Sequence, residues 1–247
     1  EMPRFLNKEK KFSDQKIIDV LVNVFGQSRV PDTLPRALHG DSTYISNEPE
    51  FDNFHPRKAK PRAIGITGYQ AIIDAAKFPK SKKVFAYIHP YRRFAMKHLE
   101  ELSKTKFEID AYVPELSDRD KRRLSSKGLD FVEKQSYVQL SRKYSLALHQ
   151  AGQGMCQNMT ILGLGQILIP SYPEGGINGT SVQRLKVGSV IPPSQHESLN
   201  IEKLDNVFEE MMAEDHAKRV WDRTRRFRER ARPKIDQILI KAASKYV

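Results

Sequence analysis

The sequence contains 247 residues, of which 39% are hydrophobic and 29% are charged, proportions that are ordinary for a folded protein with a sizeable core. Its longest apolar run, residues 159–170, is shorter than the roughly 18 residues that a membrane-spanning helix needs, so we expect no membrane insertion. The single cysteine, Cys156, excludes a disulfide framework and an all-cysteine metal site. The net charge of +12 indicates an anionic partner, a nucleic acid or alternatively a membrane surface.

Residues 1–62 have the pattern of an N-terminal arm that is largely irregular. Ser13 is placed to cap a helix over residues 14–25, and several prolines interrupt the sequence after Gly26. The segment HPRKAKPR, residues 55–62, is a basic tether suited to lie along phosphates, or alternatively a solvated linker. Its four candidate RNA-binding residues are Arg57, Lys58, Lys60 and Arg62.

Residues 63–114 form a second segment, which we predict to be a small α/β unit. A short helix is expected over residues 67–76 and another over residues 90–102. Residues 83–88, KVFAYI, alternate as a strand does, and residues 106–113 are compatible with a second strand. The segment therefore has a β-α-β pattern.

Residues 115–247 are expected to be nearly all helical. Ser117 caps a first helix that Gly128 ends, and helices over 129–140 and 142–149 follow. The apolar stretch CQNMTILGLGQILI, residues 156–169, is interpreted as a buried helix. Residues 170–200 are expected to be mostly loop and are compatible with a short helix around residues 181–186. A long helix capped by Asn200 is then expected to continue to about residue 231. The predicted fold class is thus mainly α, with a helical C-terminal half and a small α/β or irregular N-terminal extension.

The helical half contains four short patterns in a recognisable order. They are YSLALHQAG at 144–152, NMTILGLGQILI at 158–169, YPEGG at 172–176 and NVFEEMMAE at 206–214. In this order and spacing, the segment 115–247 resembles the endonuclease domain of the RNase III family. The resemblance implies an RNase III-like helical domain.

That family cleaves duplex RNA with carboxylates that hold Mg²⁺, and hard divalent cations need such oxygen ligands. Carried over by position, its carboxylates fall on Leu162, Gln166 and Asn206, and only Glu209 survives. Glu209 is alternatively explained by pairing with a nearby Lys or Arg. A register shift of one residue would restore a second carboxylate, Asp205. The resemblance therefore implies a domain that is not an enzyme, with no catalytic residues, no metal and no cofactor.

The C-terminal region concentrates the positive charge. Residues 218–245 hold 11 Lys and Arg but only 3 Asp and Glu, and helical spacing places several arginines on one face. Guanidinium groups pair well with phosphates, so we predict RNA contact here, with a solvated helix or a protein or membrane contact as alternatives. The predicted RNA-binding residues are Arg219, Arg223, Arg225, Arg226, Arg228, Arg230, Arg232 and Lys234.

Inactive domains of the RNase III family look like large-subunit proteins of mitochondrial ribosomes. The resemblance therefore implies a non-catalytic structural component of a ribonucleoprotein in the mitochondrial matrix, in contact with ribosomal RNA and neighbouring ribosomal proteins. One alternative is an inactive partner that forms a heterodimer with a second RNase III-like protein in organellar RNA processing or editing. The other is an accessory subunit of a mitochondrial respiratory or ATP-synthase complex.

Overall fold

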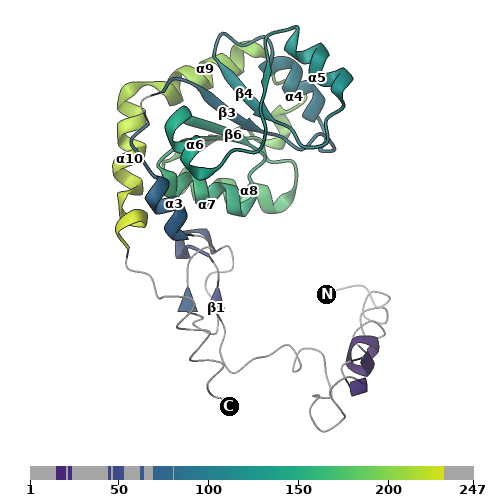
Figure 1. Cartoon of the computed structure of the whole chain (residues 1–247), viewed down its shortest axis with the longest axis vertical. Coiled ribbons are helices and arrows are strands. Elements are labelled where there is room, and N and C mark those ends of the chain that lie inside the picture. The colour runs from purple at the N-terminus through teal and green to yellow at the C-terminus, as the bar shows by residue number, and fades with distance from the viewer. Residues whose placement is uncertain are drawn as a thin grey trace. The chain divides into compact units, whose positions relative to one another are not determined.

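The computed structural model (Figure 1) places the chain in two compact units, Glu1–Ile45 with Lys58–Ala63, and Ser46–Arg57 with Ile64–Val247. In the first unit, residues 15–20 and 22–23 are helical, within the helix predicted over residues 14–25. There β1 (Tyr44–Ile45) pairs in parallel with β2 (Arg62–Ala63). The structure describes residues 15–20, 22–23, 44–45, 47–52, 62–63, 69–79 and 81–230.

The second unit is built on a six-stranded sheet in which all neighbouring strands are parallel. The strand order is β5-β4-β3-β6-β7-β8, so the chain runs outward from the centre twice, in opposite directions. This is the doubly wound arrangement of α/β proteins. The strands are β3 (Val84–Tyr87), β4 (Ile109–Tyr112), β5 (Asp130–Phe131), β6 (Leu146–His149), β7 (Gly165–Leu168) and β8 (Gly188–Val190).

Helices cover both faces of this sheet (Figure 1). One face packs against α4 (Ala95–Leu102), α5 (Asp118–Ser125) and α9 (Ile201–Met212). The opposite face packs against α3 (Tyr69–Ala75), α6 (Tyr137–Lys143), α7 (Gln153–Leu162), α8 (Pro173–Arg184) and α10 (Glu214–Glu229). Two short 3-10 helices complete the unit, η2 (Pro49–Phe51) and η3 (Pro193–Gln195).

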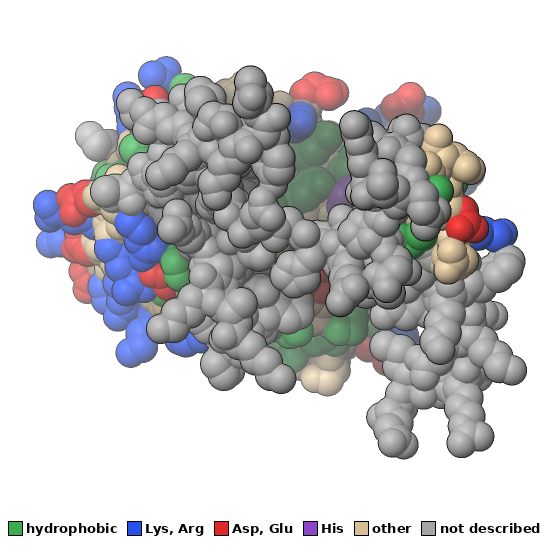
Figure 2. Space-filling model, turned by 90° about the horizontal axis from the view of Figure 1, so that it is seen from below, with side chains coloured by type: hydrophobic (Ala, Val, Ile, Leu, Met, Phe, Trp, Pro, Cys, Tyr) green, Lys and Arg blue, Asp and Glu red, His purple; other side chains and the backbone are tan. Residues whose placement is uncertain are grey.

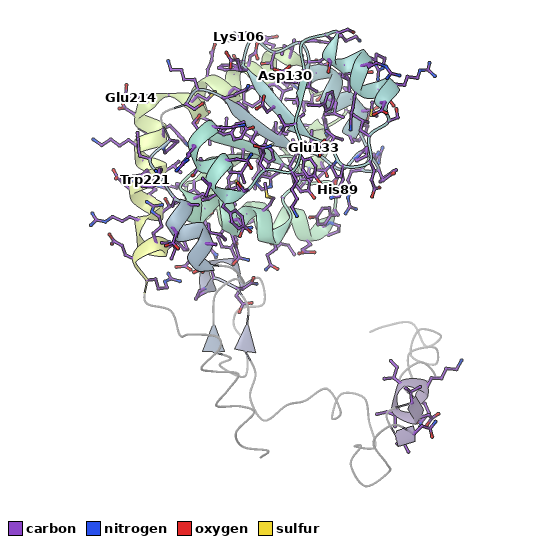
Figure 3. All side chains as sticks on the ribbon, in the orientation of Figure 1. His89, Lys106, Asp130, Glu133, Glu214 and Trp221 are labelled. Carbon is purple, nitrogen blue, oxygen red and sulfur yellow. The ribbon has the colours of Figure 1, made fainter. Side chains whose placement is uncertain are left out.

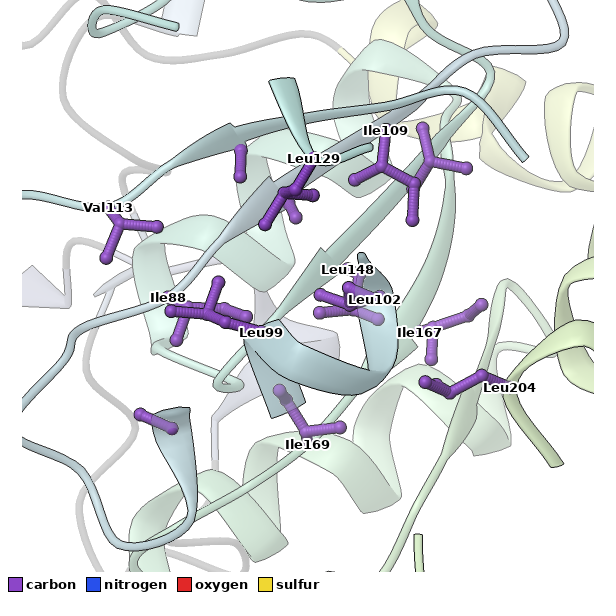
Figure 4. Close-up of a cluster of buried hydrophobic side chains, with 14 of the residues drawn as sticks. Ile88, Leu99, Leu102, Ile109, Val113, Leu129, Leu148, Ile167, Ile169 and Leu204 are labelled. Carbon is purple, nitrogen blue, oxygen red and sulfur yellow. The ribbon is translucent and has the colours of Figure 1, made fainter. Parts of the chain in front are cut away.

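The core on the first face is a continuous aliphatic cluster (Figure 4). Ile88, Leu148 and Ile167 point from the sheet toward Leu99 and neighbouring helix residues, and all four are fully buried. Burying one such side chain contributes about 1.5–3 kcal/mol, so this layer supplies much of the driving force for folding. Successive strand residues point to opposite faces, which is why Phe85 belongs to the core of the other face.

Local rules of helix initiation hold at three helices. Ser117 accepts a hydrogen bond from the Asp120 backbone N–H at the start of α5, as the sequence predicts. Asn200 accepts from the Lys203 N–H at the start of α9, which was likewise predicted. Ser136 forms a capping box at the start of α6. These caps depend only on neighbouring residues, so they can be predicted without tertiary information.

The predicted fold class, mainly α with an RNase III-like helical domain, is wrong. The segment predicted as a helix over 142–149 contains β6, a buried strand. The stretch predicted as one helix over 156–169 divides into the end of α7, a turn at Gly163 and β7. Parallel strands buried on both faces are continuously apolar, so over a few residues they have the same pattern as a buried helix.

Other predicted boundaries also shift. The predicted helix over 129–140 is replaced by β5 and α6, and the predicted loop region contains α8. The long C-terminal helix is divided into α9 and α10 at Ala213, whose φ of −56° and ψ of 135° are not helical. The division into 1–62, 63–114 and 115–247 stays a prediction, although the sheet takes strands from both of the last two segments.

A buried histidine makes the stability of this fold dependent on pH. The His98 ring on α4 lies 4.9 Å from the His196 ring, and among the described residues neither His98 nitrogen has a hydrogen-bond partner. Burial, reinforced by the charges of His196 and Lys97, lowers the pKa of His98 to about 4. The unfolded chain takes up a proton near pH 6.5 and the folded chain does not, so stability is complete above that pH and decreases below it.

We therefore expect the free energy of unfolding to fall by about 2 kcal/mol for this histidine between pH 7 and pH 5. The variant His98→Phe, which keeps a ring of similar size, should lose less stability over that interval than the wild type. Urea unfolding followed by circular dichroism at both pH values measures the difference. A variant His89→Phe, changed at an exposed position, is the control, and equal pH dependence in His98→Phe and wild type would refute the prediction.

Candidate functional site

The strand order reverses between β3 and β6, and the loops that follow these strands lead to helices on opposite faces. In doubly wound sheets this reversal opens a crevice at the carboxyl ends of the strands, where ligands bind. Figure 3 marks this end of the sheet with His89 and Glu133, which follow β3 and β5. Lys106 and Asp130 mark the opposite end.

Hydrogen bonds connect the two loops across the reversal. The His89 backbone N–H donates to Gln150 Oε1 at 3.0 Å, and Gln150 Nε2 donates to the His89 carbonyl at 3.4 Å. The Tyr87 hydroxyl lies 2.7 Å from His89 Nε2. The Gln150 side chain therefore fixes the loop after β6 to the His89 backbone in the loop after β3, 61 residues earlier in the sequence.

The N-terminus of α7 is open toward this crevice. Gly152 is its N-cap and no side chain caps it, in contrast to α5, α6 and α9. A Cβ on Gly154, in the first turn, would have no atom within 4 Å. The first backbone N–H groups of a helix lack intrahelical partners and carry a partial positive charge, so an uncapped, sterically open end of this kind suits an anion.

Tyr172 and Arg92 border the same end. The Tyr172 hydroxyl lies 3.6 Å from the position that a Cβ on Gly152 would occupy. The Arg92 guanidinium lies 4.7 Å from the centre of the Tyr172 ring, and Arg92 and Arg93 are both exposed. Burial, and then the Glu174 charge, raises the pKa of Tyr172, so its hydroxyl remains a donor at neutral pH. Backbone N–H groups, a hydroxyl and a cation thus meet at one place.

A pocket of about 550 Å³ lies beside the first turns of α7. Tyr87 and Tyr112, the last residues of β3 and β4, stack in its wall with ring centres 5.6 Å apart and planes 10° apart. Polar side chains from the loop before α6 and from α7 complete the lining. The residues that line it include Phe85, Tyr87, Tyr112, Gln135, Ser136, Tyr137, Met155 and Asn158. A volume of this size, with aromatic walls and polar side chains beside them, suits a flat, ring-containing ligand.

Buried polar side chains connect α7 to the strands on which it packs. Gln166 Nε2 donates to the Thr160 hydroxyl at 2.9 Å and to the Cys156 carbonyl at 3.2 Å, and Gln166 Oε1 lies 3.1 Å from His149 Nε2. Burial lowers the pKa of His149 to about 4 and raises that of Cys156 to about 12, so both are neutral at physiological pH. These groups are interior connections between β6, β7 and α7 and have no access to a ligand.

The predicted RNA-binding arginines on α10 lie in different environments. Arg225 pairs with Glu229, and Arg230 pairs with Glu48 and Glu50 near η2. The Arg228 guanidinium lies 3.6 Å from the Trp221 ring centre and donates to the Ile161 carbonyl. Arg219, Arg223, Arg225 and Arg226 are exposed. Arg57, Lys58, Lys60, Arg232 and Lys234 lie outside the described residues, and Arg62 lies in β2. RNA contact through these residues stays a prediction.

The positions compared with nuclease carboxylates are not brought together. Leu162 ends α7 in the core, and Gln166 belongs to the interior network described above. Glu209, on α9, forms an ion pair with Lys106, and Asp205 accepts a hydrogen bond from the Thr105 hydroxyl. Over the described ranges, no group of three or more His, Cys, Asp or Glu is placed to hold a metal ion.

No protein-family model matches the chain, and no curated protein matches it in sequence. Its fold, however, matches solved glycosyltransferases. VinC in complex with DTDP has a TM-score of 0.60 at 12% identity, covering 92% of this chain and 57% of VinC. CalG4, the calicheamicin glycosyltransferase, has a TM-score of 0.55 at 14% identity, with coverage of 91% and 61%. The spinosyn rhamnosyltransferase SpnG, complexed with spinosyn aglycone, has 0.52 at 14% identity, with coverage of 79% and 54%.

At identities this low the matches show the fold alone, a Rossmann-like α/β fold that this chain shares with these solved glycosyltransferases. This chain spans between 54% and 61% of the length of these three proteins. The RNase III-like assignment is wrong, because the described parallel sheet and its helices do not form that domain. The functions derived from it are corrected with it: a non-catalytic ribosomal component, ribosomal RNA and protein partners, and an RNase III-like heterodimer. The separate alternative of a respiratory or ATP-synthase subunit is corrected as well, because the fold matches solved glycosyltransferases.

Sequence reasoning missed the site because it assigned helix to the strand that precedes it. The strand LALH, a turn that ends at Gly152, and α7 with Gly154 in its first turn form the strand-turn-helix unit of an anion site. The two glycines were the available signal. They indicate a site only once residues 146–149 are known to be a strand. Among the described helices, none is both long enough and apolar enough to cross a membrane.

Arg228 offers a test of whether an arginine of α10 has an interior role. It donates to the Thr224 hydroxyl at 2.8 Å and to the Trp221 carbonyl at 2.8 Å, while Trp221 packs against Gly163 so closely that a Cβ there would overlap the indole. The variant Arg228→Ala should lose about 2–4 kcal/mol of unfolding free energy in urea, because several charge-assisted hydrogen bonds and a cation–π contact disappear.

The matched control is Arg225→Ala on the same helix, since the Arg225–Glu229 pair is exposed and such pairs add little stability. Its midpoint of urea unfolding should remain at the wild-type value. If the two variants unfold at the same urea concentration, the packing role assigned to Arg228 is wrong.

Proposed function

We propose that this chain carries the nucleotide-sugar-binding part of a glycosyltransferase. The observation that carries the proposal is the crevice at the strand reversal, where the uncapped N-terminus of α7 adjoins an aromatic pocket. A nucleoside diphosphate has the two matching parts, an anionic diphosphate and a flat base. The fold shared with VinC, a glycosyltransferase solved in complex with DTDP, supports the same ligand class.

In this arrangement the diphosphate lies at the first turn of α7 and the base lies in the pocket lined by Tyr87 and Tyr112. Met155, in the first turns of α7, also lines the pocket, so the two subsites are contiguous. An α-helix N-terminus binds phosphate through its backbone N–H groups and its dipole. Arg92 and the Tyr172 hydroxyl add a cation and a donor at the edge of that site.

The same groups suit a transfer reaction. When a sugar leaves a nucleoside diphosphate for an acceptor, the glycosidic carbon–oxygen bond to the phosphate breaks and the diphosphate gains negative charge. Hydrogen-bond donors and cations that already point toward the diphosphate interact more strongly with the charge of the transition state than with the intact nucleotide sugar, so they lower the barrier. We infer that the α7 N-terminus, Tyr172 and Arg92 stabilise the departing diphosphate. Activity as an enzyme, the identity of the sugar and the acceptor, and location in the mitochondrial matrix stay proposals.

A charge reversal at Gly154 tests the site directly. Gly154→Asp introduces no clash, because a Cβ there meets no atom within 4 Å, and a carboxylate in the first turn favours the helix. It should therefore leave the thermal midpoint of unfolding unchanged or slightly raised. Binding of thymidine diphosphate or uridine diphosphate, measured by titration calorimetry, should weaken about tenfold or more. The added carboxylate would occupy the position of the phosphate and repel its negative charge.

Gly176→Asp is the matched control, since it adds the same charge to α8 at another glycine whose Cβ would be unobstructed. It should retain nucleotide affinity within about twofold of the wild type. The proposal is refuted if neither nucleotide binds the wild-type chain, or if Gly154→Asp binds both as tightly as the wild type does.

A further inference from the structure

A second hollow lies at the other end of the sheet, away from the crevice. Its volume is about 400 Å³, and it is formed where the turn between α8 and β8 meets α10. That turn leads into the amino end of β8, whereas the crevice lies at the carboxyl ends. Figure 2 shows Lys and Arg side chains gathered among acidic ones on the side where Figure 1 draws α10. The two hollows are therefore separate sites.

Four of the residues that line this hollow are cations, and none is an acid. Arg184 and Lys186 come from the end of α8 and the turn after it, and Arg223 and Arg226 come from α10. All four are exposed, and no ion pair joins any of them to a carboxylate within the described part of the chain. Like charges around one concave surface repel each other and concentrate a positive potential there.

Two of these cations also serve the fold. Arg184 donates to the Glu50 backbone carbonyl at 2.6 Å, and Arg223 donates to the Lys186 carbonyl at 3.0 Å. A guanidinium has five N–H donors, so each keeps further donors for a ligand while its position is fixed. Lys186 and Arg226 make no such contact to a carbonyl in the described structure.

The charge of Glu50 interacts with Arg226, but it is already compensated. Burial alone would raise the pKa of the Glu50 carboxyl, but hydrogen bonds from Arg230 and its own backbone, with the charges of Arg230 and Arg226, hold it below its usual value. Glu50 is therefore ionised and paired with Arg230. It leaves the positive potential of the hollow largely intact.

We propose that this hollow binds a compact anion carrying several phosphate groups. Among the described residues, the exposed cations of α10 extend from Lys218 to Arg226, a distance of about 12 Å at the helical rise per residue. Beyond Arg226, Arg228 is stacked on Trp221 and Arg230 is paired with two glutamates. A nucleic-acid strand needs a basic track that continues past the pocket, whereas two or three linked phosphates match the span that is present.

The test uses sodium tripolyphosphate and calorimetry on the full 247-residue chain. All chains carry Gly154→Asp, so that the end of α7 is closed to anions and failure of the proposed function is distinguishable from failure of this inference. We expect one tripolyphosphate to bind per chain, with an affinity that falls as salt is added. The double variant Lys186→Gln, Arg226→Gln should bind at least about tenfold more weakly, because two charge-assisted contacts are lost.

The matched control, Arg119→Gln with Lys127→Gln, removes the same charge near α5, where both residues are exposed. It should bind tripolyphosphate as the parent chain does. An equal loss of tripolyphosphate affinity in both double variants would show attraction to net charge alone and overturn the proposal. Unchanged affinity in Lys186→Gln, Arg226→Gln would overturn it as well. A twelve-nucleotide single-stranded RNA is titrated in parallel. The inference also fails if RNA binds through these residues and tripolyphosphate does not displace it.

Discussion

The parallel pairing of β3 with β6 is the interaction on which the rest of the structure depends. Val84 pairs with Leu146 and Tyr87 with His149, so strands more than 60 residues apart become neighbours at the centre of the sheet. From this pair the chain builds outward in both directions and sends α4 and α7 to opposite faces. The crevice is a geometric consequence of that divergence, and the proposed ligand site depends on the pairing for its existence.

Helix ends at the carboxyl edge are of two kinds, and the difference is chemical. α5 and α6 begin with serine caps that satisfy their own N–H groups, whereas α7 and α8 have no side-chain cap. The uncapped α7 end is held in place instead by the interior hydrogen bonds of Gln166 with Thr160 and Cys156. The Gln166 side chain thus contributes to order around the proposed diphosphate site without touching a ligand.

Positive charge in this protein has more than one use. Arg228 and Arg230 are engaged within the fold, one on Trp221 and one between Glu48 and Glu50, although sequence alone groups them with the exposed arginines. Helical spacing identified the α10 face but not which of its guanidinium groups fold against the body of the protein. For Arg230, that distinction requires the position of Glu48 and Glu50, about 180 residues earlier in the chain. The tertiary structure also shows that Arg223 and Arg226 line the hollow, whereas the other arginines of α10 do not.

The sequence by itself determined the features that short-range physics fixes: the caps at Ser117 and Asn200, and the two strands in residues 83–88 and 106–113. It could not distinguish β6 and β7 from helix, because a strand buried on both faces has no alternation to read. Only the tertiary structure decided those strands, since they are stable as strands only between β3 and β8. The candidate site likewise depends on tertiary structure, because Arg92, Gly152 and Tyr172 come together only after the sheet has formed.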